Sequence, residues 1–332
     1  MKVPFPVPAY LPPCAARPGS LLSRSFRAAL LTLSAGLAAH PAAAQAAPAR
    51  PAAAAPGSTG AAAGRPGGTP EWVRPGEWVS LGGVRPSLLQ APAGCAARAC
   101  SVVVVSHPRG QDAERLRDSP QVQVLIQALL RANFAVLLGS DGGPDSWGSP
   151  AGLGHLGVAH ATATRRFHWN GHTYALGLSM GGLMALRSAL PGAPYPVQGV
   201  ALIDAWTDLE VAWGSALSRR SEIEAAYRSA TRPEPGLNPL PAALRGAPLP
   251  LFVVSSLDDT TVKASLNSDR LLAHALPGVS EFLPVTGPHL GGNRFTPAVA
   301  QRLVKFFERL DTLESPPATP EIPSLPSARP GH

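Results

Sequence analysis

Cysteine is scarce in this sequence: only Cys14, Cys95 and Cys100 occur in 332 residues. Two neighbouring thiols without a histidine cluster beside them make a poor zinc site, so we expect no structural metal. Cys95 and Cys100 lie just before the first strongly apolar segment and would close a short disulfide loop in an exported protein. The alternative is a pair of reduced, buried thiols.

Clustered charge is also lacking. The formal net charge is +7, but four of the positive charges fall within the first 27 residues, and residues 71–312 carry 21 basic and 19 acidic side chains. An excess of +2, scattered over that segment, does not favour nucleic acid as a partner. No basic amphipathic helix stands out, so we do not expect the protein to bind a membrane surface.

The apolar run "AALLTLSAGLAA" (residues 28–39) is too short to cross a bilayer. It follows two arginines and precedes small residues, among which "AQA" (44–46) suits cleavage by signal peptidase. We therefore expect residues 1–46 to form a bacterial-type signal peptide, with the natural start nearer Leu21. Cleavage near Ala46 would give a periplasmic or secreted protein without stable membrane insertion. Since no cysteine stands at that site, we expect no lipid anchor.

Two segments have no periodic pattern of apolar residues to bury. Residues 47–70 are mostly Ala, Pro, Gly and Arg, and residues 313–332 are rich in Pro. Such compositions predict a disordered linker and a disordered tail. The folded domain is therefore expected over residues 71–312, a length that one α/β domain can fill.

Short apolar runs alternate with helical patterns through this domain. The runs are typical of strands buried on both faces, and several helical patterns begin with Ser-Pro or Thr-Pro, which suits an N-cap followed by the first turn. The strands are predicted at 101–105, 134–138, 173–178, 197–203, 250–255 and 280–285, and the main helices at 119–132, 149–167, 181–190, 262–276 and 296–310. This alternation, without internal repeats, predicts a mostly parallel central sheet flanked by helices.

The alternation is interrupted at residues 204–247 by a Pro-rich insertion with one or two helical patterns. In open α/β sheets, segments beyond the carboxyl ends of the strands build the ligand crevice. The insertion is therefore expected to form a lid or pocket wall, or to pack on the sheet as a plain helix.

The pentapeptide "GLSMG" (177–181) lies between a predicted strand and a predicted helix. It fits the pattern G-x-S-x-G, in which a serine occupies a strained turn and flanking glycines let the backbone approach closely. The following helix points its amino terminus, which favours negative charge, at that serine. Ser179 is therefore the candidate nucleophile, although a Gly-rich turn with an inert serine is the alternative.

A serine nucleophile needs a base, usually a histidine that a carboxylate orients. In this order of elements the acid follows a later strand and the histidine comes last. The motifs "SLDDTTV" and "TGPHL" stand at these two places, after 250–255 and 280–285. With these motifs the sequence resembles the α/β-hydrolase superfamily over nearly all of residues 71–312, and secreted bacterial serine esterases in particular.

The resemblance implies Asp259 as the acid, because in the family an Asp followed three residues later by Val is common at this place, and here that valine is Val262. The usual glycine three residues before the acid is replaced by Ser256. Asp258 and Asp204, the latter at the end of an earlier strand, remain alternatives.

The resemblance also implies His289 as the base. The backbone amides of Met180 and Arg109 would form the oxyanion hole, because they match the position after the nucleophile and a loop after the first strong strand. Pro108 departs from the usual glycine in that loop. We interpret His107 as a structural residue of the loop.

Pocket-lining residues are expected from two segments. The stretch "GSDGGPDSWGSPAGL" is similar to a loop of some secreted or actinobacterial esterases of the superfamily, and Asp141 and Trp147 within it either line the pocket or cap the next helix through Ser149. Trp206, in the insertion, is a candidate apolar wall.

Together these features predict a secreted serine hydrolase that cleaves carboxylic esters through a Ser179–His289–Asp259 triad and an acyl-enzyme. Its partner would be a small-molecule or polymer ester with a short or medium acyl chain or an aromatic group. Neither metal nor organic cofactor is implied. The alternatives are hydrolysis of amide, thioester or polyester bonds, and a non-catalytic exported binding module on the same fold.

Overall fold

The computed structural model describes residues 72–82 and 85–314. These residues all belong to one of the two units of the chain, Arg65–His332. The predicted signal peptide (1–46), the linker (47–70) and the tail from residue 315 lie outside the described residues. The last described helix reaches Glu314, two residues beyond the predicted end of the domain at 312.

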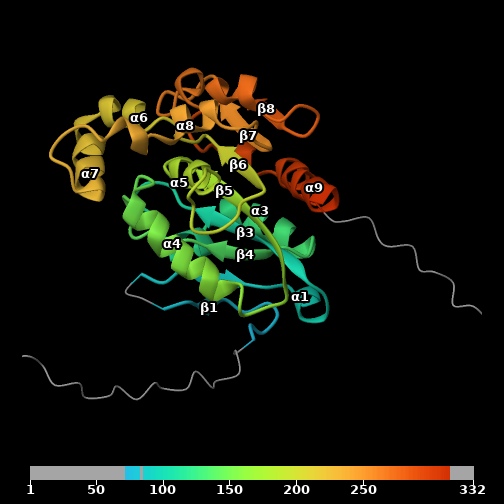
Figure 1. Cartoon of the computed structure of the whole chain (residues 1–332). Helices are drawn as coiled ribbons and strands as arrows, with labels where there is room; N and C mark the ends of the chain where they lie inside the picture. Colours follow the sequence, from blue (N-terminus) through green and yellow to red (C-terminus); the bar gives the residue numbers. More distant parts are fainter. Residues whose placement is uncertain (1–71, 83–84, 315–332) are drawn as a thin grey trace, which may run out of the picture. The chain divides into compact units, whose positions relative to one another are not determined.

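The described residues contain one eight-stranded sheet in the order β1-β2-β4-β3-β5-β6-β7-β8 (Figure 1). β3 to β8 pair in parallel, whereas β1 and β2 add an antiparallel edge. The strands are β1 (Val79–Ser80), β2 (Leu88–Gln90), β3 (Cys100–Ser106), β4 (Ala135–Leu138), β5 (Trp169–Leu178), β6 (Gly199–Ile203), β7 (Leu251–Ser256) and β8 (Glu281–Val285). This architecture confirms the predicted fold class. β1 and β2 went unpredicted because runs of two or three residues are too short to show a period.

The central strands are apolar on both faces because helices cover both. In β3, Val103 and Val105 pack toward one face with α2, α3 and α9, while Val102 and Val104 pack toward the other with α4 and α5. Figure 1 shows α4 and α9 on opposite sides of the strands. The α-helices of the described residues are α1 (Gly94–Ala97), α2 (Ala113–Asp118), α3 (Pro120–Arg131), α4 (Pro150–Ala163), α5 (Gly181–Ser188), α6 (Leu209–Ser215), α7 (Leu217–Tyr227), α8 (Pro239–Arg245) and α9 (Pro297–Glu314).

The predicted Ser-Pro starts of two helices occur as N-caps. The Ser119 side chain accepts a hydrogen bond from the Val122 amide at the start of α3, and Ser149 accepts one from Gly152 at the start of α4. In both cases a proline occupies the first helical position, where a missing N–H costs nothing.

The predicted helix at 262–276 is wrong as an α-helix. The segment forms two short 3₁₀ helices, η2 (Ala264–Leu266) and η3 (Ser268–His274), on either side of Asn267. The Asn267 side chain is fully buried and accepts hydrogen bonds from the amides of Thr207 and Asp208, at 3.0 and 3.2 Å. This long-range bonding interrupts a sequence that has a helical apolar pattern.

The insertion predicted at 204–247 contains α6, α7, a 3₁₀ turn η1 (Pro235–Leu237) and α8. α8 packs on the sheet through Leu240 and Ala243. Ile223 of α7 instead packs with Trp147 and Trp206, which lie beyond the carboxyl ends of β4 and β6. Both expectations for the insertion therefore hold, each for a different part of it.

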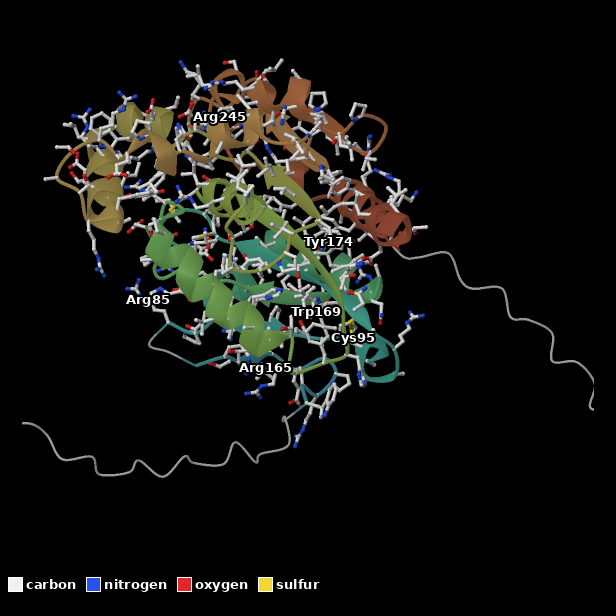
Figure 2. The ribbon with its side chains drawn as sticks, viewed as in Figure 1. Arg85, Cys95, Arg165, Trp169, Tyr174 and Arg245 are labelled. Carbon is white, nitrogen blue, oxygen red and sulfur yellow. A yellow bond between two sulfur atoms is a disulfide. The ribbon has the colours of Figure 1, made fainter. Side chains whose placement is uncertain are left out.

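Side-chain hydrogen bonds connect β3 and β5 to α9. Cys95 (labelled in Figure 2) forms a disulfide with Cys100, the first residue of β3. Asp311, in the last turn of α9, accepts hydrogen bonds from Ser101 Oγ at 2.7 Å and from the hydroxyl of Tyr174 at 2.6 Å. His172 Nδ1 also lies 2.9 Å from Asp311 Oδ1.

Candidate active site

Ser179 occupies the turn between β5 and α5 with a backbone φ of +49°. The flanking glycines are sterically required: a Cβ on Gly177 would lie 2.6 Å from the Gly181 carbonyl oxygen, and one on Gly181 would lie 2.2 Å from that of Ser106. Such contacts are far below normal van der Waals separation. The turn thus holds a non-glycine residue in a left-handed conformation, which costs energy unless the surroundings enforce it.

Ser179, His289 and Asp259 form a continuous hydrogen-bonded line. Ser179 Oγ lies 2.8 Å from His289 Nε2, and His289 Nδ1 lies 2.6 Å from Asp259 Oδ2. The Asp259 side chain is fully buried, whereas 19 % of the His289 side chain is exposed. The other carboxylate oxygen of Asp259 accepts hydrogen bonds from the amides of Thr261 and Val262. These bonds fix the carboxylate in the orientation that reaches the imidazole.

The two alternative acids bind elsewhere on the histidine loop. Asp258 accepts a hydrogen bond from the Gly287 amide at 2.9 Å. Asp204 accepts from the Leu290 amide at 2.7 Å and pairs with Arg294 at 2.8 Å, with both side chains fully buried. Both carboxylates therefore hold the segment around His289, while Asp259 contacts its ring.

The loop that contains Arg109 is anchored by His107. The His107 ring is buried, with Nδ1 2.8 Å from the Pro108 carbonyl oxygen and Nε2 3.3 Å from that of Ser140. In the described part of the chain, the amides of Arg109 and Met180 have no hydrogen-bond partner. Both are therefore available to an incoming oxygen, and Arg109 itself lines the cleft beside Ser179.

The insertion reaches this loop through Glu222 of α7. Glu222 forms a bidentate ion pair with Arg109, in which Arg109 Nε lies 2.7 Å from Oε2. The indole N–H of Trp147 donates to the same carboxylate at 3.1 Å. The bond to Arg109 is the largest cause of a lowered pKa for Glu222, so this carboxylate is ionised at neutral pH.

A cleft of about 530 Å³ opens in front of Ser179. Its wall includes Trp147 and Trp206, which were predicted to line it, and Arg109, whose backbone amide was predicted as an oxyanion donor. Asp145, Arg219 and Glu222 also line it, together with Pro108, Gly110, Gln111, Thr261, His289 and Leu290. The sequence predicted the insertion as a wall but not Arg219 or Glu222, because nothing local distinguishes them from solvent-exposed charges on a helix.

Asp141, predicted to contact substrate, does not line the cleft. Its side chain is completely buried, with Oδ2 3.9 Å from His107 Nε2. Burial raises the pKa of this carboxyl, and the nearby imidazole opposes that effect. The alternative interpretation of the segment holds for Ser149, which caps α4.

One group of side chains in the described residues has the spacing of a metal site. Single ligand atoms of Asp204, Asp259 and His289 all lie within 4.8 Å of one another. The three side chains are nevertheless engaged with protein donors and acceptors, and Arg294 already supplies a positive charge to Asp204. The group therefore resembles a hydrogen-bonded charge network more than an open coordination site. Across residues 72–82 and 85–314, no helix is both long and apolar enough to span a membrane.

No protein-family model matches the chain. No curated protein matches it in sequence. Solved structures do match: a truncated carbohydrate esterase from gut microbiota has 14% identity and a TM-score of 0.52, over 68% of this chain and 91% of that one. An inhibited esterase B from Lactobacillus rhamnosis has 12% identity and a TM-score of 0.52, over 71% and 88%. A sugar hydrolase, YeeB, from Lactococcus lactis has 16% identity and a TM-score of 0.51, over 71% and 98%. At such identities the likeness concerns the fold.

Proposed function

We propose that this chain, which has the α/β-hydrolase fold, is a serine hydrolase that cleaves carboxylic esters through an acyl-enzyme. One observation carries the proposal: Ser179 Oγ, the His289 ring and the buried Asp259 carboxylate are joined by hydrogen bonds of 2.8 and 2.6 Å at the wall of a cleft. A serine hydroxyl is a weak nucleophile at neutral pH, and this arrangement supplies both a base and the group that orients it.

The proposed chemistry uses each of these groups. His289 Nε2 takes the proton from Ser179 Oγ as the oxygen attacks the ester carbonyl, and Asp259 stabilises the imidazolium that forms. The amides of Met180 and Arg109 stabilise the carbonyl oxygen as it gains negative charge, assisted by the amino terminus of α5. His289 then gives the proton to the departing alcohol. Water, activated by the same histidine, releases the acid and restores Ser179.

Esters are the proposed substrates because two of the structural neighbours, the carbohydrate esterase and esterase B, are esterases, an argument from fold likeness rather than from a bound ligand. The cleft of about 530 Å³, with Trp147 and Trp206 in its wall, has the size of a small-molecule site and suits a short or medium acyl chain or an aromatic group. Amides, thioesters and polyesters would use the same three residues.

The test is covalent labelling followed by an ester panel. A fluorophosphonate probe should modify Ser179, located by peptide mass spectrometry, and the label should be lost in His289→Ala although that variant keeps its serine. Short-chain 4-nitrophenyl esters should then be hydrolysed by the wild-type protein. A folded wild-type protein that takes no label would overturn the proposal in favour of a non-catalytic binding module.

We also propose that the mature protein is exported to the periplasm or beyond. The support is the signal-like sequence at 1–46, together with the Cys95–Cys100 disulfide, a bond that persists in oxidising compartments. Amino-terminal sequencing of the protein from an expressing bacterium should find a new terminus close to Ala47 in the extracytoplasmic fraction. An uncleaved cytoplasmic protein would contradict export.

A further inference from the structure

Arg219 of α7 lines the same cleft as Ser179 and His289. Its guanidinium carbon lies 5.4 Å from the centroid of the Trp206 ring. Trp206 in turn donates its backbone N–H to the Ser179 carbonyl oxygen at 2.9 Å. A single aromatic residue thus connects Arg219 to the nucleophile turn, and a small molecule in the cleft can reach both.

The bonding of Arg219 differs from that of the other arginine in the cleft. Arg109 is engaged by both oxygens of Glu222. Arg219 Nη1 donates to Ser215 Oγ at 2.9 Å, and within the described residues no carboxylate oxygen lies within 4.0 Å of its guanidinium. Because a guanidinium has five N–H donors, Arg219 retains the capacity to bind a further acceptor.

The electrostatic surroundings favour an anion beside Arg219. Burial and the positive charge of Arg109 both lower its pKa, and the attraction of Glu222 opposes these effects only in part. The remaining acidic residue of the cleft, Asp145, acts on Arg109 instead. Nearby carboxylates therefore neutralise the positive charge of Arg219 less than that of Arg109. A negative charge brought into the cleft would stabilise the charged form of Arg219.

We propose that the cleft takes esters that carry an anionic group, a carboxylate being the simplest, and that Arg219 binds this group while the ester carbonyl lies at Ser179. The inference rests on the proposed esterase function and narrows its substrate class. A carboxylate suits the position because a guanidinium presents paired, coplanar N–H donors that match its two oxygens.

The neighbouring Arg220 provides a matched control. It lies on the same helix and carries the same charge, and its guanidinium carbon is 4.2 Å from the centroid of the Trp213 ring, but it does not line the cleft. If Arg219 merely covers an aromatic ring, as Arg220 does, the two arginines should be equivalent toward charged substrates. Arg219→Gln and Arg220→Gln change the net charge of the protein equally.

The experiment compares two pairs of esters, each with a charged and a neutral member of similar shape. Mono-4-nitrophenyl adipate and 4-nitrophenyl hexanoate place the charge on the acyl side, and 4-acetoxybenzoate and its methyl ester place it on the alcohol side. The ratio of kcat/KM for the charged over the neutral member is measured after subtraction of spontaneous hydrolysis. For at least one pair it should fall about tenfold or more in Arg219→Gln, and less in Arg219→Lys. It should stay within about twofold in Arg220→Gln. Equal ratios in wild type and Arg219→Gln, or an equal fall in both Gln variants, would overturn the inference.

A binding measurement separates this inference from the proposed function. Calorimetry with Ser179→Ala and monomethyl adipate should detect binding that is at least about tenfold weaker in the Ser179→Ala/Arg219→Gln double variant. If the wild-type protein hydrolyses no ester but this difference is present, the esterase proposal fails and the anion site stands. If neutral esters are hydrolysed and both variants bind the probe equally, the anion site fails and the esterase proposal stands.

Discussion

Among single residues, Asp258 and Asp259 offer the sharpest contrast, because neighbours of the same chemistry face different partners. Asp259 contacts the His289 ring, whereas Asp258 accepts a hydrogen bond from the Gly287 backbone. We expect Asp259→Asn to lower kcat by about 10³ to 10⁴, since the imidazole would lose both its orientation and its counter-charge. Asp258→Asn should lower kcat by less than about tenfold, because only the loop would loosen.

Steady-state kinetics on one ester, with thermal unfolding as a control for folding, decides between these two carboxylates. A larger loss in Asp258→Asn than in Asp259→Asn would reverse the assignment of the acid.

The stability of the folded protein should depend on pH through His160. This histidine of α4 stacks on Tyr195, with ring centroids 4.4 Å apart, and its Nε2 lies 2.8 Å from Thr173 Oγ1. Burial lowers its pKa from 6.5 to about 4. Between pH 6.5 and about 4 the unfolded chain therefore binds a proton at His160 that the folded chain excludes. The unfolding free energy is highest above pH 6.5 and decreases as the pH falls toward 4. The loss should be about 3 kcal/mol.

Urea unfolding of the wild type and of His160→Gln at pH 7 and pH 4.5 tests this directly. The variant is less stable at pH 7, but its stability should fall less between the two pH values. An equal change in unfolding free energy between pH 7 and pH 4.5 in both proteins would show that His160 is not the group responsible.

Candidate site residues could be singled out from sequence where they depend on local backbone or on strand order. Ser179 was found through its two glycines, and Asp259 and His289 through their places after successive strands. Asp141 was assigned wrongly to the cleft because it lies close in sequence to Trp147, a cleft residue, and a one-dimensional pattern does not reveal that the carboxyl turns inward toward His107. Arg219 and Glu222 were missed because their partners, Trp206 and Arg109, lie far away along the chain.

At the scale of elements, α7 and the Arg109 loop are joined by the Glu222 carboxylate. Glu222→Gln should lower kcat/KM by about tenfold, because the loop that carries the proposed oxyanion donor, the Arg109 amide, would lose its fixed position. The unfolding free energy should fall by less than about 1 kcal/mol, since 41 % of the Arg109 side chain and 23 % of the Glu222 side chain are exposed.

Glu210→Gln is the matched control for this element, because it breaks another Glu–Arg ion pair, with Arg232, in the same insertion but away from the cleft. The kcat/KM of Glu222→Gln should be lower than that of Glu210→Gln, while the two variants should have similar unfolding free energies. Equal kinetics would mean that Glu222 does not position the loop.

The Asn267 side chain joins the η2–η3 segment to the start of the insertion. Asn267→Ala would leave the buried amides of Thr207 and Asp208 without their acceptor, so we expect the unfolding free energy to fall by about 2 to 3 kcal/mol. Denaturant unfolding measures this. Asn267→Asp, which keeps an acceptor oxygen but buries a charge, should also destabilise; a neutral result for the alanine variant would show that water replaces the side chain.

The α-helix predicted at 262–276 was wrong because of these long-range hydrogen bonds of Asn267. Apolar spacing at 262–276 satisfies a helical period, yet the backbone N–H groups that donate to Asn267 Oδ1 lie 60 and 59 positions earlier in the chain. Sequence patterns reach a few residues in either direction. They therefore predicted the central strands and capped helices well and failed where tertiary hydrogen bonds override local preference.

For the whole molecule, the disulfide and the candidate active site lie at opposite ends of the sheet. The Cys95–Cys100 disulfide lies at the amino end of β3, and Ser179 lies past the carboxyl end of β5. Cys95→Ala/Cys100→Ala should lower the unfolding free energy by about 2 kcal/mol, as expected for a short closed loop, while kcat/KM per folded molecule stays unchanged. Thiol titration of the unfolded, unreduced wild-type protein should detect no free thiol at either position; two titratable thiols would rule out the bridge.

The contact between Asp311 of α9 and Ser101 of β3 has a consequence for synthesis, because it joins residues 210 positions apart. α9 also covers one face of the central strands through Leu303, Phe306 and Phe307. A nascent chain whose first strands have left the ribosome still lacks this cover until α9 has been translated. The apolar face of its sheet stays open to chaperones during that interval. The fold can therefore be completed only after α9 has been translated, which is compatible with the proposed export of an unfolded chain through a membrane pore.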